Sequence, residues 1–339
     1  MPTLLADFDY ELPPDRIAQT SLEPREAAKL LVMDRFEGTI DDRHVGDLPS
    51  LFNEGDLLVF NDSKVFKARL EGMLEDGTEA ECFLLRPLEG GFWEALIQPG
   101  KKLKPESRIL FAEGASCVLK EKTDQGTAIV GFGMTPDQVF DLSDRIGTVP
   151  VPPYVEKNER NQAEYQTVYA KERGSVAAPT AGFHFTESLL QQLEANGVKK
   201  AFVTLHVGLG TFRPIKTETL EGHDMHAEWG RVPDETIKLI RETKARGKKV
   251  YAVGTTATRA LESWGNEGGA WSGYTNLFIT PGYTFKTIDG LMTNFHLPKS
   301  TLIVLVSSFA GRENVLKAYK HAIEHEYRFY SFGDAMLVR

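Results

Sequence analysis

The feature that most constrains the fold is a change of pattern along the chain. Residues 61–150 contain short β-prone runs about every ten residues, separated by Gly, Pro, Asp and Lys turns and interrupted by no helical pattern. This spacing is typical of a small all-β barrel or sandwich. The remainder alternates helical and strand-like patterns, which indicates an α/β layer. The sequence therefore predicts an α/β domain formed by residues 1–60 and 151–339, with an all-β barrel domain inserted at 61–150.

Local signals divide the predicted α/β domain into elements. The expected elements are a Thr-capped helix at 186–196, a strand at 199–208, an Asp-capped helix at 233–247, a strand at 248–254 and a helix entered through a loop at 255–264. The proline-rich segment 147–155 is expected to return the chain from the barrel. The apolar run 300–311 fits either a buried strand or a helix.

Charge and hydropathy limit the possible partners. A formal net charge of −9 argues against general coating of nucleic acid, which needs many cations facing the phosphates. Residues 238–249 hold six basic residues and one acidic residue, which predicts either a basic patch or an ordinary solvated helix face. No run approaches the roughly 18 apolar residues of a membrane span, and no basic region precedes an apolar stretch at the N-terminus. We therefore expect a cytoplasmic protein with no membrane partner.

Histidines concentrate in the second half of the chain, where seven of the eight lie between residues 184 and 325. The segment "LHVGLGTFRP" (205–214) follows a predicted strand and supplies Gly208, Gly210 and Thr211, whose backbone N–H groups can approach a ligand closely. It is not a dinucleotide-binding fingerprint, because the third glycine is missing and a proline blocks an immediate helix. We interpret it as a ligand-binding loop.

A second candidate ligand site lies in "VGTTATRALES" (253–263). A predicted strand ends at Gly254, and the chain passes through Thr255 and Thr256 into the start of a helix. The free N–H groups and the dipole at a helix N-terminus suit a carboxylate or a phosphate. A helix that is merely capped explains the same pattern equally well.

The segment "EGHDMHAEW" (221–229) brings His223, His226 and Glu228 close together in sequence, as metal ligands often are. Its short length between two glycines favours an extended segment, in which His226 and Glu228 share one face and His223 lies on the other. A carboxylate beside an imidazole serves proton transfer equally well. We favour proton transfer, and predict no metal site.

An amphipathic helix is predicted near the C-terminal end of the sequence. His321 points nearly opposite its apolar stripe, and His325 is also expected at the surface. Glu326 falls on the middle of the apolar face if the helix extends that far. A carboxylate there needs either a catalytic use or an ion pair, for which Arg328 and Arg259 are candidates.

A tight turn leads into the first predicted helix and places His184 between Phe183 and Phe185. Aromatic side chains also flank His296 and Arg328, and such rings can stack on a purine-like base. The alternative is that the two phenylalanines only anchor the turn and leave His184 facing solvent.

Long, uncommon strings connect this sequence with a known family. They are "DFDYELPPDRIAQ" (7–19), "LLVFNDSKVFKARL" (57–70), "PTAGFHFT" (179–186), "HVGLGTFRP" (206–214), "GTTATRALES" (254–263), "TNLFITPGYTFKTIDGLMTNFHLPKSTL" (275–302) and "EHEYRFYSFGDAM" (324–336). Through these strings the chain resembles the S-adenosylmethionine:tRNA ribosyltransferase-isomerases of queuosine biosynthesis almost from end to end. Phe183 stands where leucine is expected, and Ala28-Lys29 where Ser-Arg is usual.

The resemblance implies an α/β catalytic domain with an inserted β-barrel domain, in agreement with the pattern of the chain. It implies an enzyme that transfers and isomerises the ribosyl group of S-adenosylmethionine onto 7-aminomethyl-7-deazaguanine at the wobble position of tRNA. Adenine and methionine are released and epoxyqueuosine-tRNA is formed. The expected partners are S-adenosylmethionine, which is consumed as a substrate, and a tRNA that contains the deazaguanine. No cofactor is expected, and the protein is expected to be a monomer.

This chemistry needs a base for the C5′ proton beside the sulfonium, a neutral attacking amine and a proton for the leaving adenine. The expected catalytic residues are His184 or His206 as the base, His226 with Glu228 for proton handling, and Glu326. The expected substrate-binding residues are Thr180, Phe183, Gly208, Gly210, Thr211, Thr255, Thr256 and His296, with Thr255 and Thr256 at the methionine carboxylate. Lys299 and Arg328 are expected to face tRNA phosphate.

Two functions of other classes stay open at this point. A metal-dependent hydrolase would use His223, His226 and Glu228, and metal analysis would reveal it. A non-catalytic tRNA-binding module would use the barrel and the basic segment 238–249, and would bind tRNA without consuming S-adenosylmethionine.

Overall fold

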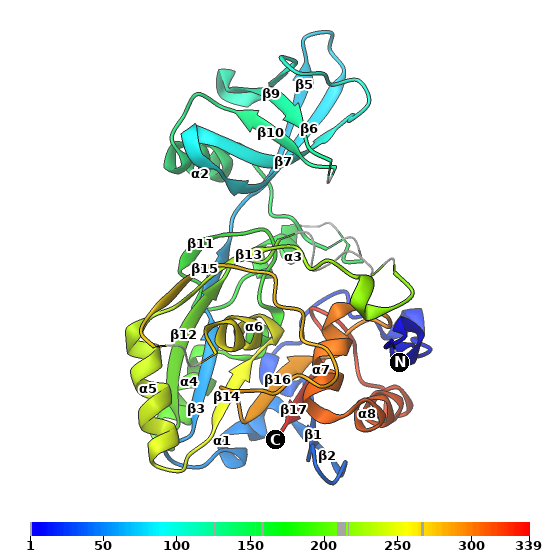
Figure 1. Cartoon of the computed structure of the whole chain (residues 1–339), viewed down its shortest axis with the longest axis vertical. Helices are drawn as coiled ribbons and strands as arrows, with labels where there is room; N and C mark the ends of the chain where they lie inside the picture. The colour runs from blue at the N-terminus through cyan, green and yellow to red at the C-terminus, as the bar shows by residue number, and fades with distance from the viewer. Residues whose placement is uncertain are drawn as a thin grey trace.

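The computed structural model describes residues 2–124, 126–152, 154–156, 159–208, 215, 217–265 and 268–339. The chain forms a large α/β domain and a smaller barrel that stands at one end of it (Figure 1). The barrel interrupts the α/β domain in sequence, because strands before and after it join the same large sheet. The predicted fold class is therefore confirmed.

The large sheet has nine strands among the described residues, in the order β15-β13-β12-β3-β14-β16-β17-β1-β2. Their bounds are β1 Lys29–Met33, β2 Ile40–His44, β3 Leu57–Asn61, β12 Lys199–Leu205, β13 Glu228–Val232, β14 Val250–Val253, β15 Trp271–Thr275, β16 Gly290–Asn294 and β17 Ala335–Val338. Strands β12, β3, β14 and β16 run parallel to one another. Their carboxyl ends therefore share one edge of the sheet, where ligands bind in open α/β folds.

Helices cover both faces of this sheet. On one face lie α5 Asp234–Ala245, α6 Thr255–Trp264, α7 Thr301–Ala310 and α8 Arg312–Glu324, and on the other α1 Leu48–Leu51 and α4 Glu187–Ala195. The central strand β3 is buried along its whole length, with Leu57 and Val59 in the first core and Leu58 and Phe60 in the second. Alternation of side chains along a strand produces this division, so an unbroken apolar run is what a covered sheet requires.

The barrel is a closed sheet in the order β10-β7-β6-β5-β8-β9. Its strands are β5 Arg69–Leu74, β6 Glu79–Pro87, β7 Phe92–Gln98, β8 Arg108–Leu110, β9 Ser116–Lys122 and β10 Ala128–Gly131. Between barrel and large sheet, β4 Ser63–Val65 pairs in parallel with β11 Glu172–Ser175, and α3 covers Glu159–Glu164. The predicted boundaries at residues 60 and 150 stay a prediction.

One helix within the barrel segment was not predicted. Helix α2, Pro136–Ile146, packs Phe140 edge-on against Phe66 and Trp93 in the barrel core. Its start is well specified, because Thr135 caps the N–H of Gln138 and a proline occupies the first turn. The expectation that no helix interrupts 61–150 was therefore wrong.

Most elements expected in the α/β domain are confirmed, with two adjustments. Helix α4 begins after Thr186, whose hydroxyl accepts the N–H of Leu189 as predicted. Asp234 is the first residue of α5 rather than its cap. The ambiguous run at 300–311 is helix α7, capped by Ser300.

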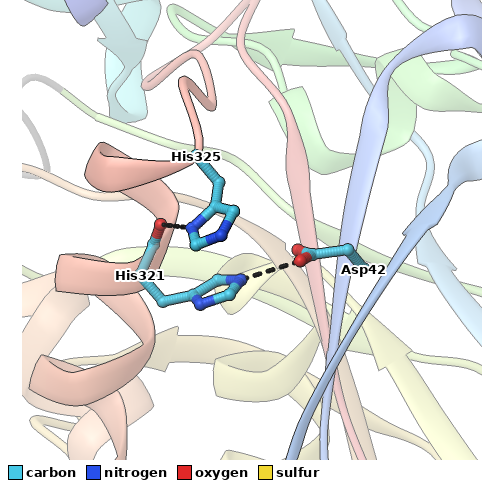
Figure 2. Close-up of side chains that lie close together, drawn as sticks. All are labelled: Asp42, His321 and His325. Carbon is cyan, nitrogen blue, oxygen red and sulfur yellow. Dashed lines mark hydrogen bonds and ion pairs between the residues drawn. The ribbon is translucent and has the colours of Figure 1, made fainter.

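Helix α8 ends at Glu324, before the residue that was expected on its apolar face. His321 and His325 lie at the surface as expected, beside Asp42 of β2 (Figure 2). Among the residues that the structure describes, no helix combines the length and the apolar character that crossing a bilayer requires.

Candidate functional site

Two cavities lie at the carboxyl edge of the parallel strands. The first, which we name the strand-end cavity, has a volume of about 310 Å³ and is lined by residues that follow β14 and β16. The second, the interdomain cavity, has a volume of about 360 Å³ and is lined by residues of both the barrel and the large sheet. Both volumes fall in the range of small-molecule sites. Val207 lines both cavities, so they adjoin each other.

The N-terminus of α6 opens into the strand-end cavity. Gly254 precedes the helix with a φ of 92°, and Thr255 and Thr256 occupy its first turn and line the cavity. The hydroxyl of Thr256 is buried and has no hydrogen-bond partner among the described residues. Thr180, from the turn at Thr180–His184, also lines this cavity. Free N–H groups, the helix dipole and an unused hydroxyl together favour an anionic ligand group here.

His296, which was expected to bind substrate, and Lys299, which was expected to face tRNA phosphate, also line this cavity. The His296 imidazole is buried, and its Nε2 lies 2.8 Å from the hydroxyl of Thr293. Burial lowers the pKa of His296 to about 3, so its imidazole is neutral at physiological pH. Lys299 is half exposed, and its Nζ lies 2.5 Å from a carboxylate oxygen of Asp9.

The interdomain cavity has walls from two parts of the fold. The large sheet contributes His206, Glu228 and Tyr274, and the barrel contributes Arg86 and Glu94. The Arg86 guanidinium is 2.7 Å from Glu94 and lies over the Tyr274 ring, 5.1 Å from its centroid. A cation–π contact therefore joins the barrel to strand β15 at the rim of this cavity.

His206 directly follows β12 and is held on several sides. Its Nδ1 lies 2.7 Å from the Ser63 hydroxyl, and its ring stacks on Trp229 with 5.1 Å between centroids and 22° between planes. A side chain at Gly174 would meet Nε2, because an added Cβ would lie 2.6 Å from that atom. Burial lowers the pKa of His206 to about 4. The ring is thus neutral, oriented and placed in the cavity wall.

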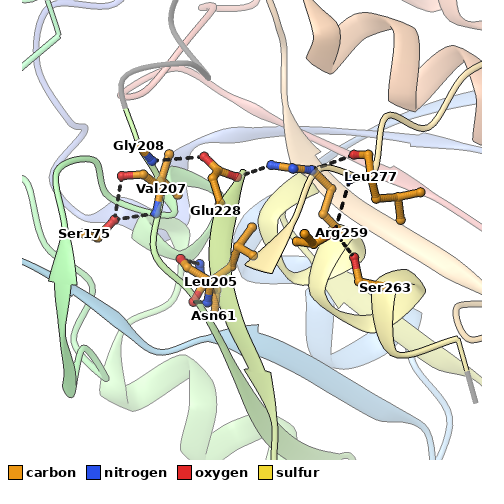
Figure 3. Close-up of polar contacts among 10 residues, drawn as sticks. Asn61, Ser175, Leu205, Val207, Gly208, Glu228, Arg259, Ser263 and Leu277 are labelled. Atoms are coloured by element: carbon orange, nitrogen blue, oxygen red, sulfur yellow. Dashed lines mark hydrogen bonds and ion pairs between the residues drawn. The ribbon is translucent and has the colours of Figure 1, made fainter. Parts of the chain in front are cut away.

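Glu228 is buried and connects two neighbouring segments (Figure 3). One of its carboxylate oxygens accepts the N–H of Gly208 at 3.0 Å, and the other forms an ion pair with Arg259 of α6. The Arg259 guanidinium also donates to the carbonyl of Leu277 at 3.1 Å, while its Nη2 has no partner among the described residues. His226 is exposed at the edge of the same cavity.

His184 and Phe183 occupy other places than the sequence suggested. Phe183 is buried against Tyr165 and Phe332, and neither Phe183 nor His184 lines the strand-end cavity or the interdomain cavity. We therefore assign Phe183 to the core, because its ring has no exposed face for a substrate. His184 is buried too, and does not face solvent.

His184 is instead linked to the strand-end cavity by a hydrogen bond to one residue of the cavity wall. Its Nε2 lies 3.2 Å from the amide nitrogen of Asn294, which lines that cavity. Burial, with smaller contributions from Arg328 and Arg25, lowers the pKa of His184 to about 3. This imidazole is a neutral acceptor that orients Asn294.

Glu326 and Arg328 also differ from expectation. Glu326 follows the end of α8 with a φ of 56°, its side chain is 73% exposed, and it faces Arg16 at 3.4 Å. The premise of a buried catalytic carboxylate was wrong, because the helix ends before this residue. Arg328 lies 3.5 Å from Asp334 and donates to the carbonyl of Thr20, so its charge is used within the fold.

The remaining predicted residues divide into two groups. Gly208 lines the interdomain cavity, whereas Gly210 and Thr211 lie outside the described residues.

For the metal alternative, the His223 ring packs edge-on against Phe278, and Glu228 is engaged by Gly208 and Arg259. The described side chains of that segment therefore do not form a metal-ligand set.

Several residues of the site were missed in the sequence. They are Ser63, Arg86, Gly174, Trp229, Tyr274 and Asn294. Signals were available for three of them: Ser63 and Asn294 lie in the quoted strings at 57–70 and 275–302, and Trp229 directly follows Glu228. The barrel residues had no local signal.

Fold and site together define an α/β enzyme with an inserted β-barrel and two adjoining ligand cavities at the strand edge. Residues 5–338 match the family described as "Queuosine biosynthesis protein". The chain is also similar to a crystal structure of S-adenosylmethionine tRNA ribosyltransferase from Thermotoga maritima, with 37% identity, a TM-score of 0.58 and coverage of 98% of this chain and 100% of that one. The chain therefore belongs to the queuosine biosynthesis protein family, and the predicted family and enzyme class are confirmed.

Proposed function

We propose that this enzyme transfers the ribosyl group of S-adenosylmethionine to the aminomethyl nitrogen of 7-aminomethyl-7-deazaguanine at the tRNA wobble position. A new N–C bond forms, the bonds from the sugar to sulfur and to adenine break, and the sugar rearranges to an epoxycyclopentanediol. Adenine, methionine and a proton are released, and epoxyqueuosine-tRNA is the product. S-adenosylmethionine is consumed, and no metal or redox cofactor takes part.

The observation that carries this proposal is the pair of adjoining cavities with Val207 in both walls. A two-substrate transfer needs both reactants held within reach of each other. S-adenosylmethionine occupies the strand-end cavity, with its carboxylate at Thr255 and Thr256, where the helix N-terminus and a buried unpartnered hydroxyl favour an anion. The deazaguanine enters the interdomain cavity beneath the barrel, beside His206.

His206 is the better of the two candidate bases. It lines the interdomain cavity and is neutral, whereas His184 lies outside the lining of both cavities. For Nε2 to accept the C5′ proton, Nδ1 must carry the hydrogen and donate it to the Ser63 hydroxyl. His226, exposed at the cavity edge, then exchanges protons with solvent, and Glu228 holds the backbone of Gly208 at the junction of the cavities.

Contact with tRNA involves the exposed cations at the openings of the cavities. Lys299 is half exposed beside the strand-end cavity, and Arg86 projects from the barrel over the interdomain cavity. Lys299 pairs with a carboxylate that is about half exposed, and phosphate can replace that carboxylate at modest cost because exposed ion pairs contribute little stability. The partner of Arg86, Glu94, is only 14% exposed, so Arg86 keeps this pair and offers phosphate the exposed part of its guanidinium. Arg328 is not retained in this role, since Asp334 and the Thr20 carbonyl already engage it.

The test uses the purified, EDTA-treated protein with S-adenosylmethionine and a tRNA that carries the aminomethyl-deazaguanine. Mass spectrometry measures free adenine, free methionine and the mass of the wobble nucleoside. We expect adenine, methionine and modified tRNA in equal amounts. For His206→Ala we expect turnover to fall by at least about 100-fold. The same tRNA with an unmodified guanine at the wobble position is the control and is expected to gain no mass.

Other outcomes would contradict the proposal in distinguishable ways. Adenine release without a mass gain on tRNA would indicate hydrolysis or a different acceptor. Binding of tRNA with no consumption of S-adenosylmethionine would indicate a binding module. Activity that EDTA removes and a divalent metal restores would show that a metal takes part. Turnover unchanged in a folded His206→Ala variant would exclude His206 as the base.

A further inference from the structure

Asp42, His321 and His325 form a cluster that the reaction does not use. None of the three residues lines the strand-end or the interdomain cavity. Asp42 belongs to β2, the last strand at one end of the large sheet, and His321 and His325 lie at the end of α8 (Figure 2). The cluster therefore connects an edge strand to the C-terminal end of helix α8, at the surface.

The side chains converge as ligands do. One nitrogen of each imidazole and one Asp42 oxygen lie within 4.8 Å of one another. Nε2 of His321 is 2.8 Å from Oδ2 of Asp42, and the two rings stack with 3.8 Å between centroids and 19° between planes. Residues four apart on a helix face the same side, so both imidazoles face the carboxylate.

Further hydrogen bonds orient the side chains of His325 and Asp42. Nδ1 of His325 donates to the carbonyl of His321 at 2.9 Å, which leaves the Nε2 lone pair of His325 free to coordinate. The other oxygen of Asp42 accepts the hydroxyl of the buried Tyr327. In metal sites, a carbonyl commonly accepts a hydrogen bond from the imidazole that binds the metal, and a second hydrogen bond commonly orients the carboxylate.

Nearby charges do not oppose a cation at this point. Lys29 lies beside the cluster, but its Nζ donates to the carbonyl of His325 at 2.7 Å and lies over the Tyr327 ring. The Lys29 ammonium thus points to the His325 carbonyl and the Tyr327 ring, and not to the imidazole nitrogens. Asp41, beside Asp42, adds negative charge, which Arg43 at 2.8 Å partly balances.

We propose that Asp42, His321 and His325 bind a divalent transition-metal ion with the preferences of Zn²⁺. Two imidazole nitrogens and one carboxylate oxygen suit zinc, cobalt or nickel rather than magnesium or calcium, and water completes the coordination. Bonds of about 2.0–2.2 Å require the three atoms to move closer. Asp42 and His325 are exposed and can do so by small side-chain rotations toward the less exposed His321. The ion replaces the His321–Asp42 hydrogen bond and fastens β2 to α8. This site is independent of the proposed function.

The test titrates Zn²⁺ alone into the EDTA-treated, dialysed full chain by calorimetry. We expect one equivalent to bind, with a dissociation constant at least tenfold higher in each of Asp42→Asn, His321→Ala and His325→Ala. His223→Ala, from the other histidine-containing segment, is the matched control and is expected to bind as the unchanged protein does. Co²⁺ provides a second measurement, because its visible absorption reports nitrogen and oxygen coordination.

Circular dichroism and thermal midpoints in EDTA check that each variant is folded. Zinc should raise the thermal midpoint of the unchanged protein and of His223→Ala, and should not raise that of His321→Ala/His325→Ala. If the double variant does not fold, Asp42→Asn, which keeps the side-chain shape, decides the question. Zinc binding equal in the unchanged protein and the cluster variants would overturn the proposal, as would its loss in His223→Ala. Ribosyl transfer in EDTA is tested separately and does not depend on this site.

Discussion

The Ser63 hydroxyl lies 2.7 Å from Nδ1 of His206, although 143 residues separate the two in the chain. Ser63 follows β3 and His206 follows β12, and these neighbouring parallel strands end at the same edge of the sheet. The contact fixes the ring orientation and selects which nitrogen carries the hydrogen. Ser63 is therefore a positioning residue in the proposed reaction.

Replacement of Ser63 by alanine removes this contact and leaves the cavity lining intact. We expect kcat of Ser63→Ala to fall about tenfold, the equivalent of one hydrogen bond of about 1.4 kcal/mol, with little change in KM for S-adenosylmethionine. The pH profile of kcat should also shift, because the tautomer and basicity of His206 are no longer set by the hydroxyl. A merely structural role for Ser63 would lower the thermal midpoint and leave the pH profile unchanged.

Gly174 gives a second test of the same ring. An alanine Cβ would lie 2.6 Å from Nε2 of His206, closer than nonbonded atoms approach, so Gly174→Ala must displace the imidazole. We expect turnover to fall at least tenfold while the protein stays folded, as judged by circular dichroism. Gly273→Ala is the control, because Gly273 has a similar positive φ, 159° against 150° at Gly174, and its Cβ would meet nothing within 4 Å. Equal activity of the two variants would show that His206 does not need its observed position.

The parts of the fold that were predictable are those with local signals. Thr186 caps α4 through a hydrogen bond to the third residue along, and such caps can be recognised in sequence. The barrel was predicted because its strands are short and regularly spaced. Helix α2 was missed although Thr135 and Pro136 mark its start, since the β-prone runs around it dominated the interpretation.

Most of the site was less predictable, because its contacts join distant segments. His206 was identified from its own surroundings, but Ser63 was not, since nothing local indicates which strands are neighbours. Glu326 was misplaced for another reason: its expected burial assumed two more helical residues, and α8 ends at Glu324. A helix terminus shifted by two residues rotates a side chain by more than half a turn and changes its environment completely.

Buried neutral histidines predict how stability depends on pH. The pKa of both His184 and His296 is lowered to about 3 by burial, whereas an unfolded histidine has a pKa of about 6.5. The unfolded chain therefore binds protons first as pH falls, and stability is full above pH 6.5 and declines below it. At pH 5.5 the loss should be about 1.4 kcal/mol for each of these two histidines, and His206, whose pKa is lowered to about 4, adds a similar loss, so that the three together cost about 4 kcal/mol. Urea unfolding at pH 7.5 and pH 5.5 measures it.

Variants separate this effect from that of the carboxylates. His296→Gln cannot be protonated, so the difference in stability between the two pH values should be smaller by about 1.4 kcal/mol than in the unchanged protein. His44→Ala, at an exposed position on β2, should keep the full difference. An unchanged difference in His296→Gln would mean that this imidazole is not held neutral.

The Glu228–Arg259 pair predicts a large effect on stability. Both side chains are almost fully buried, with 3% and 4% exposed, so loss of one charge leaves the other uncompensated in a poorly solvated place. We expect Glu228→Gln, which keeps the shape and an oxygen for the Gly208 N–H, to lower the free energy of unfolding by about 3–5 kcal/mol. Urea unfolding at pH 7.5 measures the change.

The matched control for this pair is an exposed one. Asp41 and Arg43 lie 2.8 Å apart with about half of each side chain exposed, and Asp41→Asn should cost less than about 1 kcal/mol because solvent already screens that pair. A double variant, Glu228→Gln/Arg259→Met, removes both buried charges and should recover part of the lost stability. A cost for Glu228→Gln no larger than that for Asp41→Asn would mean that solvent reaches the buried pair, and that the junction of the two cavities opens in solution.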